Sequence, residues 1–149
     1  MKSTQHDPLV GTWVLNPSRS QFDANHRPQA ATMVIERDDQ GRYLVTAEGI
    51  GEKGQQVTEK PQTLVPDGQP RPLPDFPGLA VTSTRPDEHT VDTDVRREDG
   101  SIAGQGTYAV SEDGQSLMAT TAGFDSQLRR FEQRTSWDKR APMESAAAV

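Results

Sequence analysis

Two phenols are the side chains in this sequence that could most readily carry chemistry. Tyr43 and Tyr108 each fall in a run of alternating apolar residues, so we expect both rings to point toward the interior of a sheet. A phenol held in an apolar cavity can orient an oxygen atom of a ligand or act as a general acid. The alternative, equally compatible with the pattern, is that each ring packs in the core with its hydroxyl group at the rim.

Acidic and basic side chains alternate with other residues between positions 89 and 98. Asp92, Asp94 and Arg96 share one face of this predicted strand. Two neighbouring carboxylates in a cavity could do acid–base work, because crowding and burial can raise the pKa of one of them. A solvent-exposed outer face is the simpler interpretation, because antiparallel strands commonly present charged residues to water.

The three histidines do not form a metal-binding pattern. His6 lies near the N-terminus, His26 falls in a long polar connection and His89 follows a predicted turn. No two of them have the spacing, together with a carboxylate, that a metal site requires. Cysteine is absent, which excludes thiolate ligands and disulfide bonds. We therefore expect neither a metal nor a cofactor.

Length and charge restrict the class of protein. The chain has 149 residues, which suits a single domain with its own core, and a net charge of -6. This acidic balance disfavours nucleic acid as a partner, because phosphate binding needs clustered positive charge. No apolar run has the length of a membrane span, and the N-terminus shows no hydrophobic signal segment. These features predict a cytoplasmic protein.

Short extended runs separated by turns predict an all-β fold. Asp-Gly pairs at residues 67–68, 99–100 and 113–114 mark tight turns between such runs. We expect an antiparallel barrel of about 8 to 10 strands over residues 9–140, between a flexible N-terminus, 1–8, and a flexible tail, 141–149. The predicted strands cover residues 9–15, 31–37, 42–48, 55–64, 79–85, 89–98, 102–110, 116–122 and 127–138.

Period-two alternation predicts which side chains face inward. Phe131, Gln133 and Trp137 share one face of the last strand, and Ile35 faces inward in the second. The proline-rich stretch 66–77 is typical of an edge or lid segment, and its Phe76 could reach into a cavity. Apolar side chains around a few polar groups indicate a site for a small apolar molecule. The predicted ligand-binding residues are Tyr43, Tyr108, Phe131, Gln133, Trp137, Ile35 and Phe76.

The first predicted strand carries the most distinctive motif. It reads Gly11-Thr12-Trp13-Val14-Leu15-Asn16, and Ser20 and Phe22 follow shortly after. With these residues the chain resembles the lipocalin-like members of the calycin superfamily, in particular small bacterial proteins. The resemblance implies an up-and-down antiparallel β-barrel with a central pocket. It also implies that Trp13 closes the barrel floor against a late basic residue, for which Arg134 and Arg140 are the candidates.

Three functions are compatible with the sequence. The first is binding of a small, largely hydrophobic molecule in the lumen of a lipocalin-like barrel. The alternative is a cofactor-free barrel enzyme, such as an isomerase, a cyclase or a hydratase, in which tyrosine, histidine or carboxylate groups move protons on a hydrophobic substrate. A third is an interaction module that presents the proline-rich segment 70–77 to another protein. A homodimer is compatible with each of them.

Overall fold

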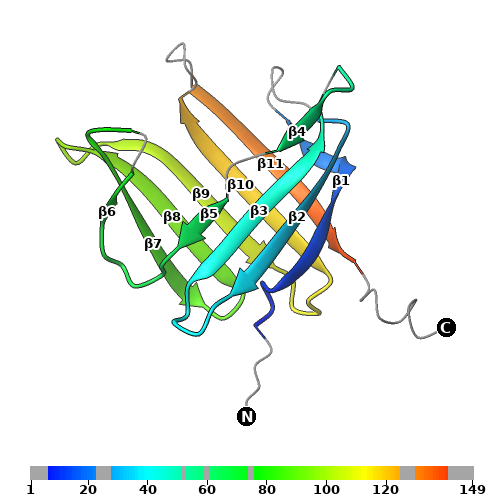
Figure 1. Ribbon diagram of the computed structural model, residues 1–149, viewed down its shortest axis with the longest axis horizontal. Helices are drawn as coiled ribbons and strands as arrows, with labels where there is room; N and C mark the ends of the chain where they lie inside the picture. The colour runs from blue at the N-terminus through cyan, green and yellow to red at the C-terminus, as the bar shows by residue number, and fades with distance from the viewer. Residues whose placement is uncertain are drawn as a thin grey trace.

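The fold is an up-and-down antiparallel β-barrel, which confirms the fold class predicted from the sequence. The computed structural model describes residues 7–22, 28–51, 53–58, 61–73, 76–124 and 130–140. Within these residues eleven strands form one antiparallel sheet that curves round on itself (Figure 1). The strands are β1 (Gly11–Gln21), β2 (Ala30–Arg37), β3 (Tyr43–Ile50), β4 (Gln56–Thr58), β5 (Gln62–Leu64), β6 (Arg71–Pro72), β7 (Leu79–Asp87), β8 (Thr90–Arg97), β9 (Ile102–Val110), β10 (Ser116–Phe124) and β11 (Arg130–Lys139).

Neighbours in the sheet are mostly neighbours in the sequence. The order is β4-β3-β2-β1-β11-β10-β9-β8-β7-β6, and β5 pairs with β3 beside β4. Only β1 and β11 are distant in the chain, and they pair with each other. The first and last described strands therefore hold each other in the middle of the sheet.

The structure has more strands than the roughly 8 to 10 that the sequence predicts. There are two local reasons for the difference. The stretch predicted as one strand over residues 55–64 forms β4, which pairs with the C-terminal half of β3, and β5, which pairs with its N-terminal half. Pro61, which has no backbone N–H to donate, lies directly before β5. Arg71 and Pro72 form a short edge strand against β7, where a proline can be accommodated.

The barrel has a seam between β5 and β6, because no strand ladder joins these two in the part of the chain that the structure describes. The N–H of Gly68 donates a hydrogen bond to the carbonyl of Ser83 at 2.9 Å. Leu64, at the end of β5, is buried in the main hydrophobic core. A turn and a core side chain thus close the seam where backbone pairing stops.

Core side chains fill the end of the barrel at which β1 begins. Trp13 is 0% exposed, and its indole N–H donates a 3.0 Å hydrogen bond to the carbonyl of Leu9. The ammonium group of Lys139 lies 5.2 Å from the centre of the Trp13 ring. The basic residue on Trp13 is therefore Lys139, not Arg134 or Arg140 as predicted. Lys139 lies opposite Trp13 in the register of β1 and β11, which places its side chain over the indole.

Gly11 makes this stack sterically feasible. Its backbone has a φ of 151°, a value that side-chain-bearing residues rarely adopt. A Cβ atom at this position would lie 2.8 Å from Cε of Lys139. Any other residue would displace the lysine stem from the indole.

Most of the predicted flexible ends lie outside the described residues, namely 1–6 of the N-terminus and the whole tail, 141–149. Asp7, which belongs to the predicted flexible N-terminus, contacts side chains of β2, β3 and β7. In the described part of the chain, no helix has the length and apolarity needed to cross a membrane.

Candidate functional site

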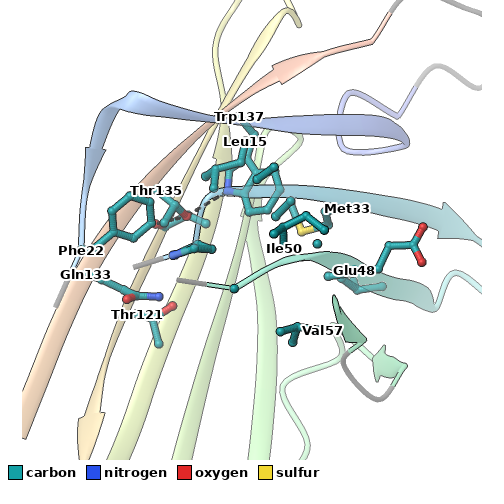
Figure 2. A pocket seen from close by; sticks show the side chains of 18 of the residues that line it. Leu15, Phe22, Met33, Glu48, Ile50, Val57, Thr121, Gln133, Thr135 and Trp137 are labelled. Atoms are coloured by element: carbon teal, nitrogen blue, oxygen red, sulfur yellow. Dashed lines mark hydrogen bonds between the residues drawn. The ribbon is translucent and has the colours of Figure 1, made fainter. Parts of the chain in front are cut away.

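A cavity of about 790 Å³ lies inside the barrel, and Trp13 is not among the residues that line it. Its wall is built by β1 to β5 and β9 to β11, together with residues that connect β1 to β2 and β3 to β4. Sites for small molecules commonly have volumes of roughly 300 to 1,000 Å³. The apolar part of the wall includes Leu15, Phe22, Met33 and Trp137, which are labelled in Figure 2, together with Val45 and Phe131.

Cross-strand register explains how three strands build one wall of the cavity. Tyr108, Ala119 and Thr135 lie opposite one another on β9, β10 and β11, and all three line the cavity. At the next inward position of these strands, Thr121 on β10 lies opposite Gln133 on β11. Because side chains two positions apart point to the same face of a strand, these residues form consecutive rows on the inner surface.

Glycines leave part of this wall without side chains. Gly106 lies opposite Thr121, and Gly104 lies opposite Gly123, so these glycines belong to the same inward rows. A Cβ atom at Gly123 would lie 3.7 Å from Cε1 of Phe131, the residue opposite it on β11. The Phe131 ring therefore covers bare backbone, an arrangement that glycine in a strand permits.

The indole of Trp137 has a fixed orientation in the cavity wall. Its N–H donates a 2.9 Å hydrogen bond to Oγ1 of Thr135, and the Thr135 hydroxyl in turn donates to the carbonyl of Ala119 at 3.3 Å (Figure 2). Both groups are buried. The Thr135 hydroxyl is thus already used as donor and as acceptor, and the indole presents its apolar ring to the cavity.

The amide oxygen of Gln133 differs from the other buried polar atoms of this wall. Gln133 Oε1 is shielded from solvent and accepts no hydrogen bond from the described residues. Figure 2 shows its side chain near Thr121, on the wall that faces the cavity. Buried polar side-chain atoms are nearly always hydrogen-bonded, so this acceptor is suited to a bound molecule.

Charge lies at the exposed edge of the cavity. Among the described lining residues the charged ones are Glu48 and Lys53, and both are exposed. In Figure 2 the Glu48 carboxylate points away from Gln133 and Trp137. The interior of the described wall therefore combines apolar side chains with neutral hydroxyl and amide groups.

Four of the predicted ligand-binding residues line this cavity, and they come from the two strands on either side of β10. They are Tyr108 on β9 and Phe131, Gln133 and Trp137 on β11. Alternation along β9 and β11 was sufficient to place them on one face, because both strands keep a regular register with β10.

The other three predicted ligand-binding residues lie outside the lining. Tyr43 and Ile35 point inward but are buried in the core, with 1% and 2% of their surface exposed. Phe76 is 58% exposed, because the connection before β7 leaves its ring at the surface instead of inside a cavity. Alternation predicts the face of a side chain but not its height along the barrel.

Phe22, Met33 and Thr121 also line the cavity, although we did not assign them to the ligand site from the sequence. Phe22 belongs to the opening motif, and Met33 shares the inward face with Ile35, so both carried a usable signal. Thr121 shares the inward face of β10 with Ala119, so alternation along this strand also carried a signal.

The acidic side chains of β8, Asp92 and Asp94, point away from the cavity. Asp92 accepts a 2.8 Å hydrogen bond from the hydroxyl of Thr107, and an oxygen of Asp94 lies 3.5 Å from a nitrogen of Arg96. Val91, the neighbour of Asp92, is buried on the opposite face. The outer-face interpretation therefore fits the structure.

Within the described ranges, no three histidine, aspartate or glutamate side chains are grouped as a metal site would require. Two of the histidines considered above, His6 and His26, lie outside those ranges.

Comparison with known proteins gives the fold and no family. No protein-family model and no curated protein matches this chain. Crystal structures of the fluorescent protein UnaG are similar: the wild type has a TM-score of 0.54 at 12% identity, covering 88% of this chain and 96% of that one. A UnaG point mutant has a TM-score of 0.57 at 12% identity, with coverage of 91% and 99%. At this identity the likeness establishes an all-β barrel fold and nothing finer.

Proposed function

We propose that this barrel binds a small, largely hydrophobic molecule in its cavity. The observation that carries the proposal is the wall itself, in which the rings of Trp137, Phe131 and Phe22 and the side chain of Met33 surround a space of about 790 Å³. Apolar lining with a few well-placed polar groups is typical of small-molecule sites. Burial of a ligand's apolar surface would supply the main driving force for binding.

The alternative of a cofactor-free enzyme needs a proton-transfer group against the substrate. The titratable side chains of the described lining are Glu48, Lys53 and Tyr108, and the first two are exposed. No specific observation favours catalysis over binding, so binding is the function for which we argue.

The proposal includes a cytoplasmic location and the absence of a nucleic-acid partner. Both rest on the sequence, through its net charge of -6 and its lack of cysteine.

Nile red, an uncharged apolar dye that becomes bright in apolar surroundings, tests this proposal. We expect saturable binding to the protein and energy transfer from tryptophan, because Trp137 forms part of the cavity wall. Thr121→Trp places an indole in the cavity, since Thr121 lines it. We expect this variant to weaken dye binding by about tenfold or more, which corresponds to about 1.4 kcal/mol.

Thr120→Trp is the matched control, because Thr120 lies on the same strand but points to the other face of the sheet. Its affinity for Nile red should equal that of the unmodified protein, and circular dichroism should show that both variants are folded. If the unmodified protein does not bind the dye, or if both variants bind it equally well, the proposed function is wrong.

A further inference from the structure

We infer that the cavity selects an uncharged molecule whose polar end donates a hydrogen bond, such as an alcohol, a phenol or a primary amide, and that Gln133 accepts this bond. The inference rests on the proposed function, because it concerns the ligand of the same cavity. It adds the chemical class of the ligand and the residue that recognises it.

The first argument is the unused hydrogen-bonding capacity of Gln133. Its Oε1 is buried and has no donor among the described residues. The nearby Thr135 hydroxyl already has partners, because it accepts from the Trp137 indole and donates its proton to the Ala119 carbonyl. A buried acceptor left without a donor destabilises a protein, so a ligand that supplies an O–H or N–H gains affinity there.

The second argument is the position of charge. The charged residues of the described lining, Glu48 and Lys53, are exposed, and Glu48 points away from Gln133 (Figure 2). A carboxylate moved to Gln133 would lose its hydration without meeting a cation on the described wall. Its oxygens would also face the Gln133 Oε1 atom, which accepts hydrogen bonds and cannot donate one. The wall therefore disfavours an anionic ligand at this depth.

The third argument is the surface around Gln133. Phe131 and Thr135 are its neighbours on the same inward face of β11, and Thr121 lies opposite it on β10. The ring of Phe131 lies on one side of this polar position, and the indole of Trp137 lies beyond Thr135 on the same face of β11. A hydrogen-bonding position beside aromatic rings suits a ring-containing ligand with a polar substituent.

Three naphthalenes substituted at the same ring position test this inference: naphthol, its methyl ether and naphthoate. Naphthol is uncharged at neutral pH and donates a hydrogen bond, the ether can only accept, and naphthoate carries a negative charge. Calorimetry or displacement of Nile red gives the three affinities. We expect naphthol to bind about fivefold to tenfold more tightly than the ether, the value of one neutral hydrogen bond. Naphthoate should bind most weakly.

Gln133→Leu removes the acceptor while keeping a side chain of similar size. In this variant naphthol and its methyl ether should bind with equal affinity, and Nile red should still bind. Gln105→Leu is the matched control, because Gln105 is exposed and lies outside the cavity lining. This control should keep the preference for naphthol.

The outcomes separate the two proposals. If neither Nile red nor any naphthalene binds, the proposed function fails, and this inference fails with it. If Nile red binds but naphthol and its ether bind equally well to the unmodified protein, or naphthoate binds most tightly, only the inference is overturned. A preference for naphthol that persists in Gln133→Leu also overturns it, because the donor would then be recognised elsewhere.

Discussion

At the residue scale, the phenol of Tyr43 takes part in closing the barrel floor. Its hydroxyl donates a 2.5 Å hydrogen bond to the carboxylate of Asp7, which also pairs with Arg37 at 3.0 Å and with Arg85 at 3.2 Å. These partners come from the N-terminal segment, β2, β3 and β7. Burial, the hydrogen bond to Asp7 and the negative charge of Asp7 raise the pKa of Tyr43 far above its ordinary value of 10.0.

This shift predicts a loss of stability in alkaline solution. The folded protein holds the phenol proton more tightly than the unfolded chain does, so the free energy of unfolding should fall as the pH rises above about 10. Tyr43→Phe should remove this alkaline loss and, at neutral pH, lower stability by about 1 to 2 kcal/mol through the lost hydrogen bond. Urea unfolding between about pH 7 and pH 11 measures both effects.

Tyr108→Phe is the control, because it removes the other tyrosine and leaves the contact between Tyr43 and Asp7 intact. It should keep the alkaline loss of the unmodified protein. An equally steep loss in Tyr43→Phe would show that another group causes it.

At the element scale, the opening motif explains an irregular step between β1 and β11. The register of these strands shifts between Asn16 and Gln21. Within this step the Ser20 hydroxyl donates to the Asn16 carbonyl at 2.8 Å and accepts from the backbone N–H of Ser136 at 2.8 Å. Ser136 is 1% exposed, so its N–H has no access to water as an alternative partner. Ser20 therefore completes the ladder where β1 leaves its register.

Ser20→Ala tests this role. The substitution leaves the buried N–H of Ser136 without an acceptor, and we expect a loss of about 1 to 3 kcal/mol of unfolding free energy. Ser18→Ala is the matched control, because the exposed Ser18 hydroxyl donates only to the side chain of Asn16. Urea unfolding should show little change in the control, and equal losses in both variants would contradict the proposed role.

The same strands show how far sequence reasoning reaches. Alternation identified the inward faces of β9 and β11, because side-chain direction in a regular strand is a local property. It could not place Tyr43 at the floor, because height in a barrel depends on how far neighbouring strands are staggered. The division of β4 from β5 depends on which half of β3 each one meets, which is also non-local.

At the scale of the whole molecule, the barrel is one continuous series of paired strands, and its two edges lie at the seam between β5 and β6. β1, β10 and β11 each have a paired strand on both sides, whereas β4 and β6 end the ladder. Across the seam, Gly68 bonds to Ser83, and Arg85 of β7 pairs with Asp7. Most of the cavity wall comes from the side of the ladder away from β6 to β8.

This arrangement predicts uneven hydrogen exchange along the sheet. Amides of β1, β10 and β11 should exchange only when the whole barrel unfolds, because opening any of these strands breaks two ladders. Amides of β4 and β6 should exchange at least about 100-fold faster, since edge strands with few paired residues open locally. Hydrogen exchange followed by mass spectrometry or NMR measures the difference. Uniform protection around the barrel would contradict the seam, because it requires backbone hydrogen bonds that join β5 to β6 in solution.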